Sequence, residues 1–209
     1  MELAKTLTGL MGPHQRFLLT EQLQHLAMLV AQIARLDQEI AQRLAPFVPL
    51  ADRLLTIPGV GRRTADVILA DIGPTVTPFR TAAALAKWIG LVPGHNESAG
   101  KRLSGRTVPG DRALRAVLVD AAYAAGRTTA TYLGAQYRRA ARVKGAKRAA
   151  IIVAHSIAVA IWHILGHDQV YVDLGGAYFD RRDREQVTQH AVKRLEALGY
   201  TVHLTQAAS

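Results

Sequence analysis

The sequence predicts an all-α protein, in which a long coiled-coil-like helix precedes a compact helical domain. Three observations support this fold class. Hydrophobic residues make up 49% of the 209 residues, which is enough for a globular core. Apolar residues recur at helical spacings of three and four through most of the chain. Only the segment Thr201–Leu204 suggests a strand, so we expect one short strand near the C-terminus.

The first predicted element is a helix between Pro13 and Pro46, a stretch without proline or glycine. Its apolar positions alternate by four and three, which is a heptad pattern with Asp37 as the only polar member. The positions are Leu19, Leu23, Leu26, Val30, Ile33, Asp37, Ile40, Leu44 and Phe47. The pattern fits a core helix inside one domain or a coiled coil with another chain. We expect a homo-oligomer that assembles through this helix.

A glycine turn between two short helices follows, with the sequence Ile57-Pro58-Gly59-Val60-Gly61. The two glycines allow a tight turn and expose backbone N–H groups at a helix N-terminus, which favours an anion. The turn resembles the helix-hairpin-helix motif, which grips a DNA phosphate without reading bases. The alternative is an ordinary corner between two helices. The resemblance implies that four residues contact nucleic acid: Gly59, Gly61, Arg62 and Thr64.

Five further helices are predicted after this turn. Their ranges are 81–89, 111–125, 131–143, 146–165 and 183–198. Thr81 is the expected N-cap of the first, which should bury Leu85, Trp88 and Ile89. The range 146–165 is strongly apolar, so we expect that helix to be buried.

Positive charge is concentrated in the middle of the chain. The formal net charge is +10, and residues 80–150 alone carry +11, from 14 Lys and Arg against three acids. The rest of the chain is close to neutral. A single basic region of this kind is typical of proteins that bind a polyanion, so we expect a nucleic-acid partner.

The segment 94–106 places serines between small residues inside this basic region. Glycines let a backbone approach a ligand closely, and nearby Lys and Arg side chains suit phosphate oxygens. The cations are Lys101, Arg102 and Arg106, with Arg112 and Arg115 on the helix that follows. The hydroxyl of Ser98 could attack a phosphodiester, whereas a solvated basic loop with an incidental serine is the alternative.

Several classes of site are disfavoured by the sequence. The chain has no cysteine, so it has no disulfide or thiolate metal site. His163 and His167 share a helical spacing but lack a third ligand, so we predict no metal site and no cofactor in this chain. No uncharged apolar run reaches the length of a membrane span, so we expect a cytoplasmic protein without a membrane partner.

Five segments, in order, resemble the C-terminal portion of insertion-sequence-110-type transposases, which are bridge-RNA-guided recombinases. They are 57–65, 88–94, 96–102, 110–115 and 135–139, and Asn96–Arg102 is the most specific. The resemblance covers nearly the whole chain and implies DNA transposition, with DNA and a guide RNA as partners. It also implies that Ser98 is a nucleophile that becomes joined to DNA, with Ser104 as the second choice.

The chain departs from this family at two places. The family has an N-terminal RuvC-like domain whose Asp-Glu-Asp-Asp set holds magnesium, and nothing in this sequence matches it. We therefore expect a truncated protein or a fragment that is inactive alone. The family is also more basic just before Gly110, where this chain has Thr107-Val108-Pro109.

The predicted organisation has three regions. Residues 1–50 form the coiled-coil region, 51–167 the transposase domain with the helix-hairpin-helix motif, and 168–209 a helical extension. Two other functions fit the same features. One is a non-catalytic helix-hairpin-helix DNA-binding module, and the other is an RNA-associated assembly scaffold.

Overall fold

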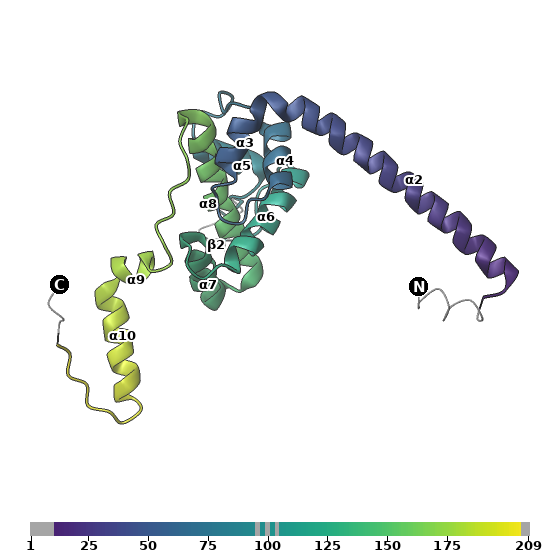
Figure 1. The fold of residues 1–209 in the computed structure, drawn as a ribbon. Helices are drawn as coiled ribbons and strands as arrows, with labels where there is room; N and C mark the ends of the chain where they lie inside the picture. Colours follow the sequence, from purple (N-terminus) through teal and green to yellow (C-terminus); the bar gives the residue numbers. More distant parts are fainter. Residues whose placement is uncertain (1–10, 95–96, 99–100, 103–104, 206–209) are drawn as a thin grey trace. The chain divides into compact units, whose positions relative to one another are not determined.

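The computed structural model describes residues 11–94, 97–98, 101–102 and 105–205, with backbone positions alone at 97–98 and 101–102. The chain divides after Val48 into two compact units (Figure 1). The first contains α2 (Pro13–Leu44) and the 3-10 turn Ala45–Phe47. The second contains α4 (Arg62–Ile72), α5 (Ala82–Ile89), α6 (Arg112–Gly126), α7 (Tyr132–Lys144), α8 (Ala146–His167), α9 (Tyr178–Arg182) and α10 (Arg184–Glu196). Helix α3 (Val48–Leu54) begins at the boundary between the two.

This architecture confirms the all-α prediction. The sheet in the described part of the chain is a single antiparallel pair of two-residue strands, β1 (Glu97–Ser98) and β2 (Lys101–Arg102). The predicted strand at Thr201–Leu204 is wrong, because this segment is irregular. Leu204 is 66% exposed, so a strand there would lack a buried face.

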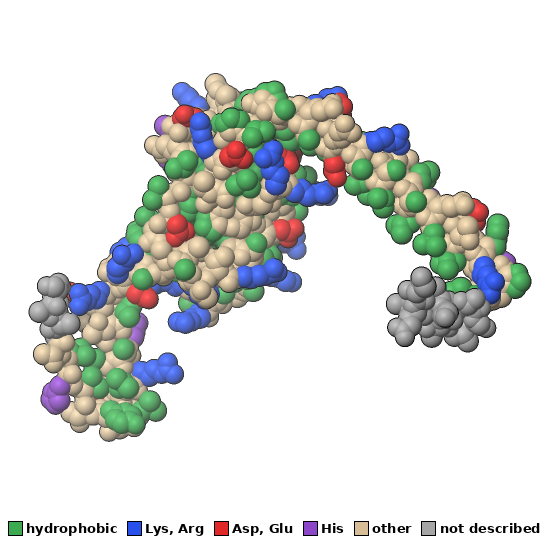
Figure 2. All heavy atoms as spheres, in the orientation of Figure 1, with side chains coloured by type: hydrophobic (Ala, Val, Ile, Leu, Met, Phe, Trp, Pro, Cys, Tyr) green, Lys and Arg blue, Asp and Glu red, His purple; other side chains and the backbone are tan. Residues whose placement is uncertain are grey.

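Helix α2 is long and has no buried residue. It begins at Pro13, and the backbone N–H of Gly12 before it donates to Gln15 Oε1 at 2.7 Å. Figure 2 shows hydrophobic side chains along this helix in solvent. The most exposed of the large ones include Phe17, Leu23, Leu26, Val30, Ile33 and Leu36. The helix is therefore confirmed, and its pairing with another chain stays a prediction.

Helix α8 is the core of the second unit. It packs against α5, α6 and α7 (Figure 1). Small side chains on α6 and α8, such as Ala122, Ala125, Ala154 and Ala158, are fully buried, and their size lets the helices approach closely. The prediction of a buried apolar helix at 146–165 is confirmed.

Among the described residues, α8 is the one helix long and apolar enough to cross a membrane by length and composition. Nine of its residues are buried against other helices, which is the pattern of a core helix. Trp162 on this helix also holds the segment between α4 and α5, since its Nε1 donates to the Phe79 carbonyl at 3.0 Å.

Threonine side chains cap two of the helices, whereas one residue of α5 is less buried than the sequence predicts. Thr81 accepts from the Ala84 N–H at 3.1 Å, and Thr131 accepts from the Gly134 N–H at 3.1 Å. Trp88, predicted to be buried, is instead 41% exposed. Its ring lies 5.3 Å from that of Phe79, so an aromatic neighbour covers part of it in place of the core.

Candidate nucleic-acid interface

The basic segment forms an antiparallel hairpin between α5 and α6. At its base, the Val108 N–H donates to the Val92 carbonyl at 3.0 Å, and the Gly94 N–H donates to the Arg106 carbonyl at 2.8 Å. Farther out, Glu97 pairs with Arg102 and Ser98 pairs with Lys101. The sequence predicts a basic loop here, and the structure instead pairs its two ends as a hairpin.

Two glycines bring the ends of this hairpin together. Gly90 ends α5 with φ +84°, a conformation that residues with a side chain rarely adopt. A Cβ at Gly110 would lie 2.4 Å from the backbone nitrogen of Gly90. Side chains at these positions would force the strands apart, so the hairpin base depends on both glycines.

Ser98 therefore lies on a strand, at the pair of the hairpin farthest from its base. Two residues, Ala99 and Gly100, separate it from its partner Lys101. Ser104, the second candidate, and the side chains of Ser98, Lys101 and Arg102 lie outside the described atoms. The backbone thus places Ser98 beside one predicted phosphate ligand, Lys101, and across from the strand that continues into Arg102.

The other predicted cations lie where the hairpin joins α6. Arg106 is exposed on the returning strand, Arg112 is exposed in the first turn of α6, and Arg115 is half-buried one turn later. Asp111 caps this helix, since its Oδ1 accepts from the Leu114 N–H at 2.8 Å. Burial and then the charge of Asp111 raise the pKa of Asp71, so Asp71 lies within electrostatic range of this cap.

The glycine turn joins α3 to α4 as the sequence predicts, but its two glycines have different surroundings. Gly59 has φ +89°, and a Cβ there would lie 2.2 Å from the Ala121 carbonyl oxygen of α6. Gly61 has φ −97° and open space where a Cβ would stand. A glycine at position 59 is therefore required for close packing against α6. At position 61, no packing within the described chain requires a glycine.

Gly61 is the N-cap of α4 and gives that helix no side-chain cap. The first backbone N–H groups of the helix, from Arg62 to Thr64, are thus available to an anion. Arg62 is half-exposed, and its guanidinium contacts Asp66 at 3.2 Å and Asp52 at 3.7 Å. These acids partly offset its charge, whereas the backbone N–H groups of the turn have no such acid partner among the described residues.

Helix α6 connects the two predicted contact regions. The hairpin ends at its first turn, and the glycine turn packs on Ala121 and Ala125. Ten residues separate Asp111 from Ala121, which corresponds to about 15 Å along a helix. The two regions are therefore distinct points on one rigid element.

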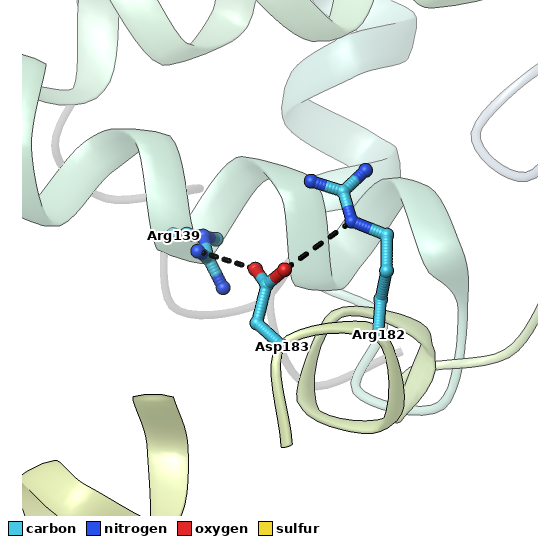
Figure 3. A network of polar contacts seen from close by, with 3 residues as sticks. All are labelled: Arg139, Arg182 and Asp183. Carbon is cyan, nitrogen blue, oxygen red and sulfur yellow. Dashed lines mark hydrogen bonds and ion pairs between the residues drawn. The ribbon is translucent and has the colours of Figure 1, made fainter. Parts of the chain in front are cut away.

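Some arginines of the basic region hold the fold together. Arg138 donates to the carbonyls of Thr128 and Thr129 at 2.6 and 2.9 Å. Figure 3 shows Asp183 between two arginines: its Oδ2 accepts from Arg139 at 2.8 Å, and its Oδ1 accepts from Arg182 at 3.4 Å. This network ties the C-terminal segment to α7, and it removes Arg139 from the set of unpaired cations.

Sequence reasoning missed a groove beside the hairpin base. It has a volume of about 660 Å³ and lies between the hairpin, α7 and α8. Gln136 and His155 line it, with the cations Lys144 and Arg148. Gln136 falls inside the segment 135–139 that carries the family resemblance, but a lone glutamine has no spacing that marks it as a ligand.

No cluster of three or more His, Asp or Glu side chains converges in the described parts of the chain.

A family model described as the Transposase IS116/IS110/IS902 family matches residues 51–138. The match covers the glycine turn, the whole hairpin and α6. The chain carries a transposase domain of the IS116/IS110/IS902 family. The predicted family is confirmed for this domain.

Relatives with related names support the assignment. A probable family 20 transposase of Pseudomonas aeruginosa is 31% identical over 74% of this chain and 46% of its own length. The transposase for insertion sequence element IS1328 of Yersinia enterocolitica is 35% identical over 53% of this chain and 33% of its own length. The IS110 uncharacterized 43.6 kDa protein of Streptomyces coelicolor is 41% identical over 36% of this chain and 19% of its own length. The chain thus spans less than half of each of these relatives.

Proposed function

We propose that this transposase domain binds DNA and provides the serine nucleophile of a strand-exchange reaction. The observation that carries the proposal is the hairpin itself. It holds Ser98 in register with Lys101, inside the matched family domain and inside a region of net charge +11. A backbone held by two glycine contacts at its base can present a hydroxyl at a defined place.

In the proposed step, Ser98 Oγ attacks a phosphorus atom of the DNA backbone. An Oγ–P bond forms, one P–O bond of the backbone breaks, and the leaving sugar oxygen takes a proton. The serine proton passes to a base, because a serine hydroxyl is a weak nucleophile at its ordinary pKa. Lys101, Arg102, Arg106, Arg112 and Arg115 would hold the phosphates and offset the developing charge.

The family resemblance assigns magnesium to a RuvC-like domain, and no group of three or more His, Asp or Glu side chains converges in the described residues. We therefore propose that the chain alone binds DNA but cleaves it poorly. With a RuvC-like domain on the same protein or on a partner, the reaction would take place in the cytoplasm, on DNA selected with a guide RNA.

The test is formation of a covalent protein–DNA adduct on a denaturing gel, with the RuvC-like domain supplied. Ser98→Ala should abolish the adduct and leave DNA affinity nearly unchanged, because one hydroxyl contributes little beside several cations. Ser104→Ala is the matched control and should keep the adduct. An adduct that survives in Ser98→Ala, or is lost in Ser104→Ala alone, overturns the assignment.

A second function, a non-catalytic helix-hairpin-helix module, is favoured by one observation. Gly61 has open space around it and leaves the N-terminus of α4 uncapped, as a phosphate contact requires. This module could act with or without the serine chemistry. If Ser98→Ala and the wild type behave alike in every DNA assay while Gly61→Asp loses affinity, the module is the better description.

A further inference from the structure

The groove beside the hairpin is built from three elements that converge. One wall is the base of the hairpin, another is α7, and the third is the first half of α8. Its volume of about 660 Å³ falls in the range of sites that hold small organic groups. Since one wall belongs to the hairpin that carries Ser98, a ligand here lies beside the proposed DNA path.

The groove has an apolar wall and a polar atom without a partner. Ile151 and Ile152 of α8 line it and are half-buried. Gln136 Oε1 is shielded from solvent and accepts no hydrogen bond from any described residue. A shielded acceptor of this kind is unfavourable unless a donor reaches it. Turning of the Gln136 side chain would bring its Oε1 into the groove, so the site fits a flat, largely apolar group with an N–H at its edge.

Two cations line the same groove on the polar side. Lys144 is in the last turn of α7 and Arg148 is in the first turn of α8, and both are exposed. Neither makes an ion pair with an acid in the described part of the chain. Gly145 between the helices leaves the α8 N-terminus without a side-chain cap. This positive side fits a phosphate.

His155 adds a second hydrogen-bonding group to the floor. It is half-buried, and burial lowers its pKa, so the ring is neutral at neutral pH and has one donor and one acceptor. A neutral imidazole can form a hydrogen bond with the edge of a nucleotide base. It adds no positive charge to the groove beyond that of the cations on its polar side.

We propose that this groove receives one unpaired nucleotide of DNA, with its base against the α8 wall and its phosphate on Lys144 and Arg148. The Gln136 side chain would turn toward the groove, so that its Oε1 accepts from an N–H of the base. The proposal rests on the DNA-binding function above, and it adds that the strand beside Ser98 is held open. A paired base cannot reach such a groove without leaving the duplex.

The experiment compares two single-stranded DNA 12-mers that have the same number of phosphates, one with bases and one with abasic residues throughout. Fluorescence anisotropy gives the affinity of each for the full chain. The wild type should bind the base-bearing strand about tenfold more tightly, since base contacts add to an equal phosphate contribution. Gln136→Leu should bring this ratio close to one. Ile152→Phe, which fills the groove, should do the same.

Charge variants test the phosphate half of the site. Lys144→Gln with Arg148→Gln should weaken binding of both strands by about tenfold, since the same phosphates are lost from each. Lys147→Gln is the matched control, because Lys147 is exposed on the same turn and does not line the groove. It should weaken binding less than threefold. Thermal melts confirm that each variant folds.

The outcomes separate this inference from the proposed function. Equal affinity of the wild type for both strands overturns the nucleotide site and leaves DNA binding standing. A base preference that persists in both Gln136→Leu and Ile152→Phe also overturns it. If only a ribonucleotide 12-mer binds more tightly than its abasic counterpart, the occupant of the groove is RNA. That result overturns the proposal of a DNA nucleotide. If neither DNA strand binds, both the nucleotide site and the proposed DNA binding are overturned.

Discussion

At the residue scale, the two glycines of the α3–α4 turn differ in what they serve: Gly59 serves the stability of the fold, and Gly61 is available for binding. Gly59 faces the α6 backbone at a positive φ, whereas Gly61 faces open space. The sequence shows only that both are glycines. Which of them the fold requires depends on α6, which lies some 60 residues later in the chain, and local spacing contains no signal of that contact.

Gly59→Ala should therefore destabilise the domain by about 2 kcal/mol or more, because the methyl group meets the Ala121 carbonyl at a strained φ. Thermal denaturation should show a Tm lower by about 4–8 °C. Gly61→Ala is the control, and its Tm should change by no more than about 2 °C while DNA affinity falls. A Tm for Gly59→Ala equal to that of the wild type contradicts this account of the turn.

His155 gives a prediction on pH. Its pKa is lowered in the folded chain by burial, so the unfolded chain binds more protons just below the ordinary value of about 6.5. The stability from the neutral ring is present above that pH and is lost as the pH falls through the folded pKa. The Tm of His155→Gln should fall less than that of the wild type between pH 7 and pH 5, by differential scanning fluorimetry. Parallel curves would show that His155 has no such role.

At the element scale, local signals were sufficient wherever a helix begins with its own cap. Thr81 precedes α5 as expected, and its side chain accepts from the backbone N–H three residues on. Thr131, predicted inside its helix, instead precedes α7 and caps it in the same way. The hairpin was missed because its pairing depends on the approach of Gly90 to Gly110, two residues on either side of a 19-residue segment. The predicted burial of Trp88 was wrong because a helical period does not reveal how far other elements cover a position. Phe79 covers part of the ring, and Trp88 stays 41% exposed.

Helix α2 gives the prediction at this scale. Its apolar positions are exposed and follow a heptad pattern, so the chain should form an oligomer in which they pair. Leu26→Asp with Ile33→Asp should convert the oligomer to a monomer in analytical ultracentrifugation, since each places a charge in the apolar contact. Arg43→Gln is the control at an exposed position of the same helix. A wild-type chain that sediments as a monomer contradicts the coiled coil.

For the whole molecule, the family and the basic region were predictable, because short sequence segments carry the family resemblance and a single stretch of the chain carries the positive charge. The groove was not, because its walls come from the base of the hairpin and from the segments 136–144 and 148–156, and nothing in any one of them indicates a cavity. The placement of the cations was also hidden. Arg138 and Arg139 count toward the basic region, yet they hold carbonyls and Asp183 inside the fold.

The last prediction concerns how the charge of the whole domain acts. If DNA phosphates replace counterions on the basic region, the logarithm of the binding constant should fall linearly with the logarithm of the salt concentration, with a slope of about −0.9 for each contact. Arg102→Glu with Arg106→Glu should weaken binding to unrelated duplexes alike and reduce that slope by about two contacts. Lys193→Glu, on exposed α10 outside the basic region, changes the net charge by the same amount per residue and should leave the slope nearly unchanged. Equal effects per substituted residue would mean that net charge, and not the hairpin, drives binding. A slope near zero in the wild type would exclude phosphate contacts as the source of binding.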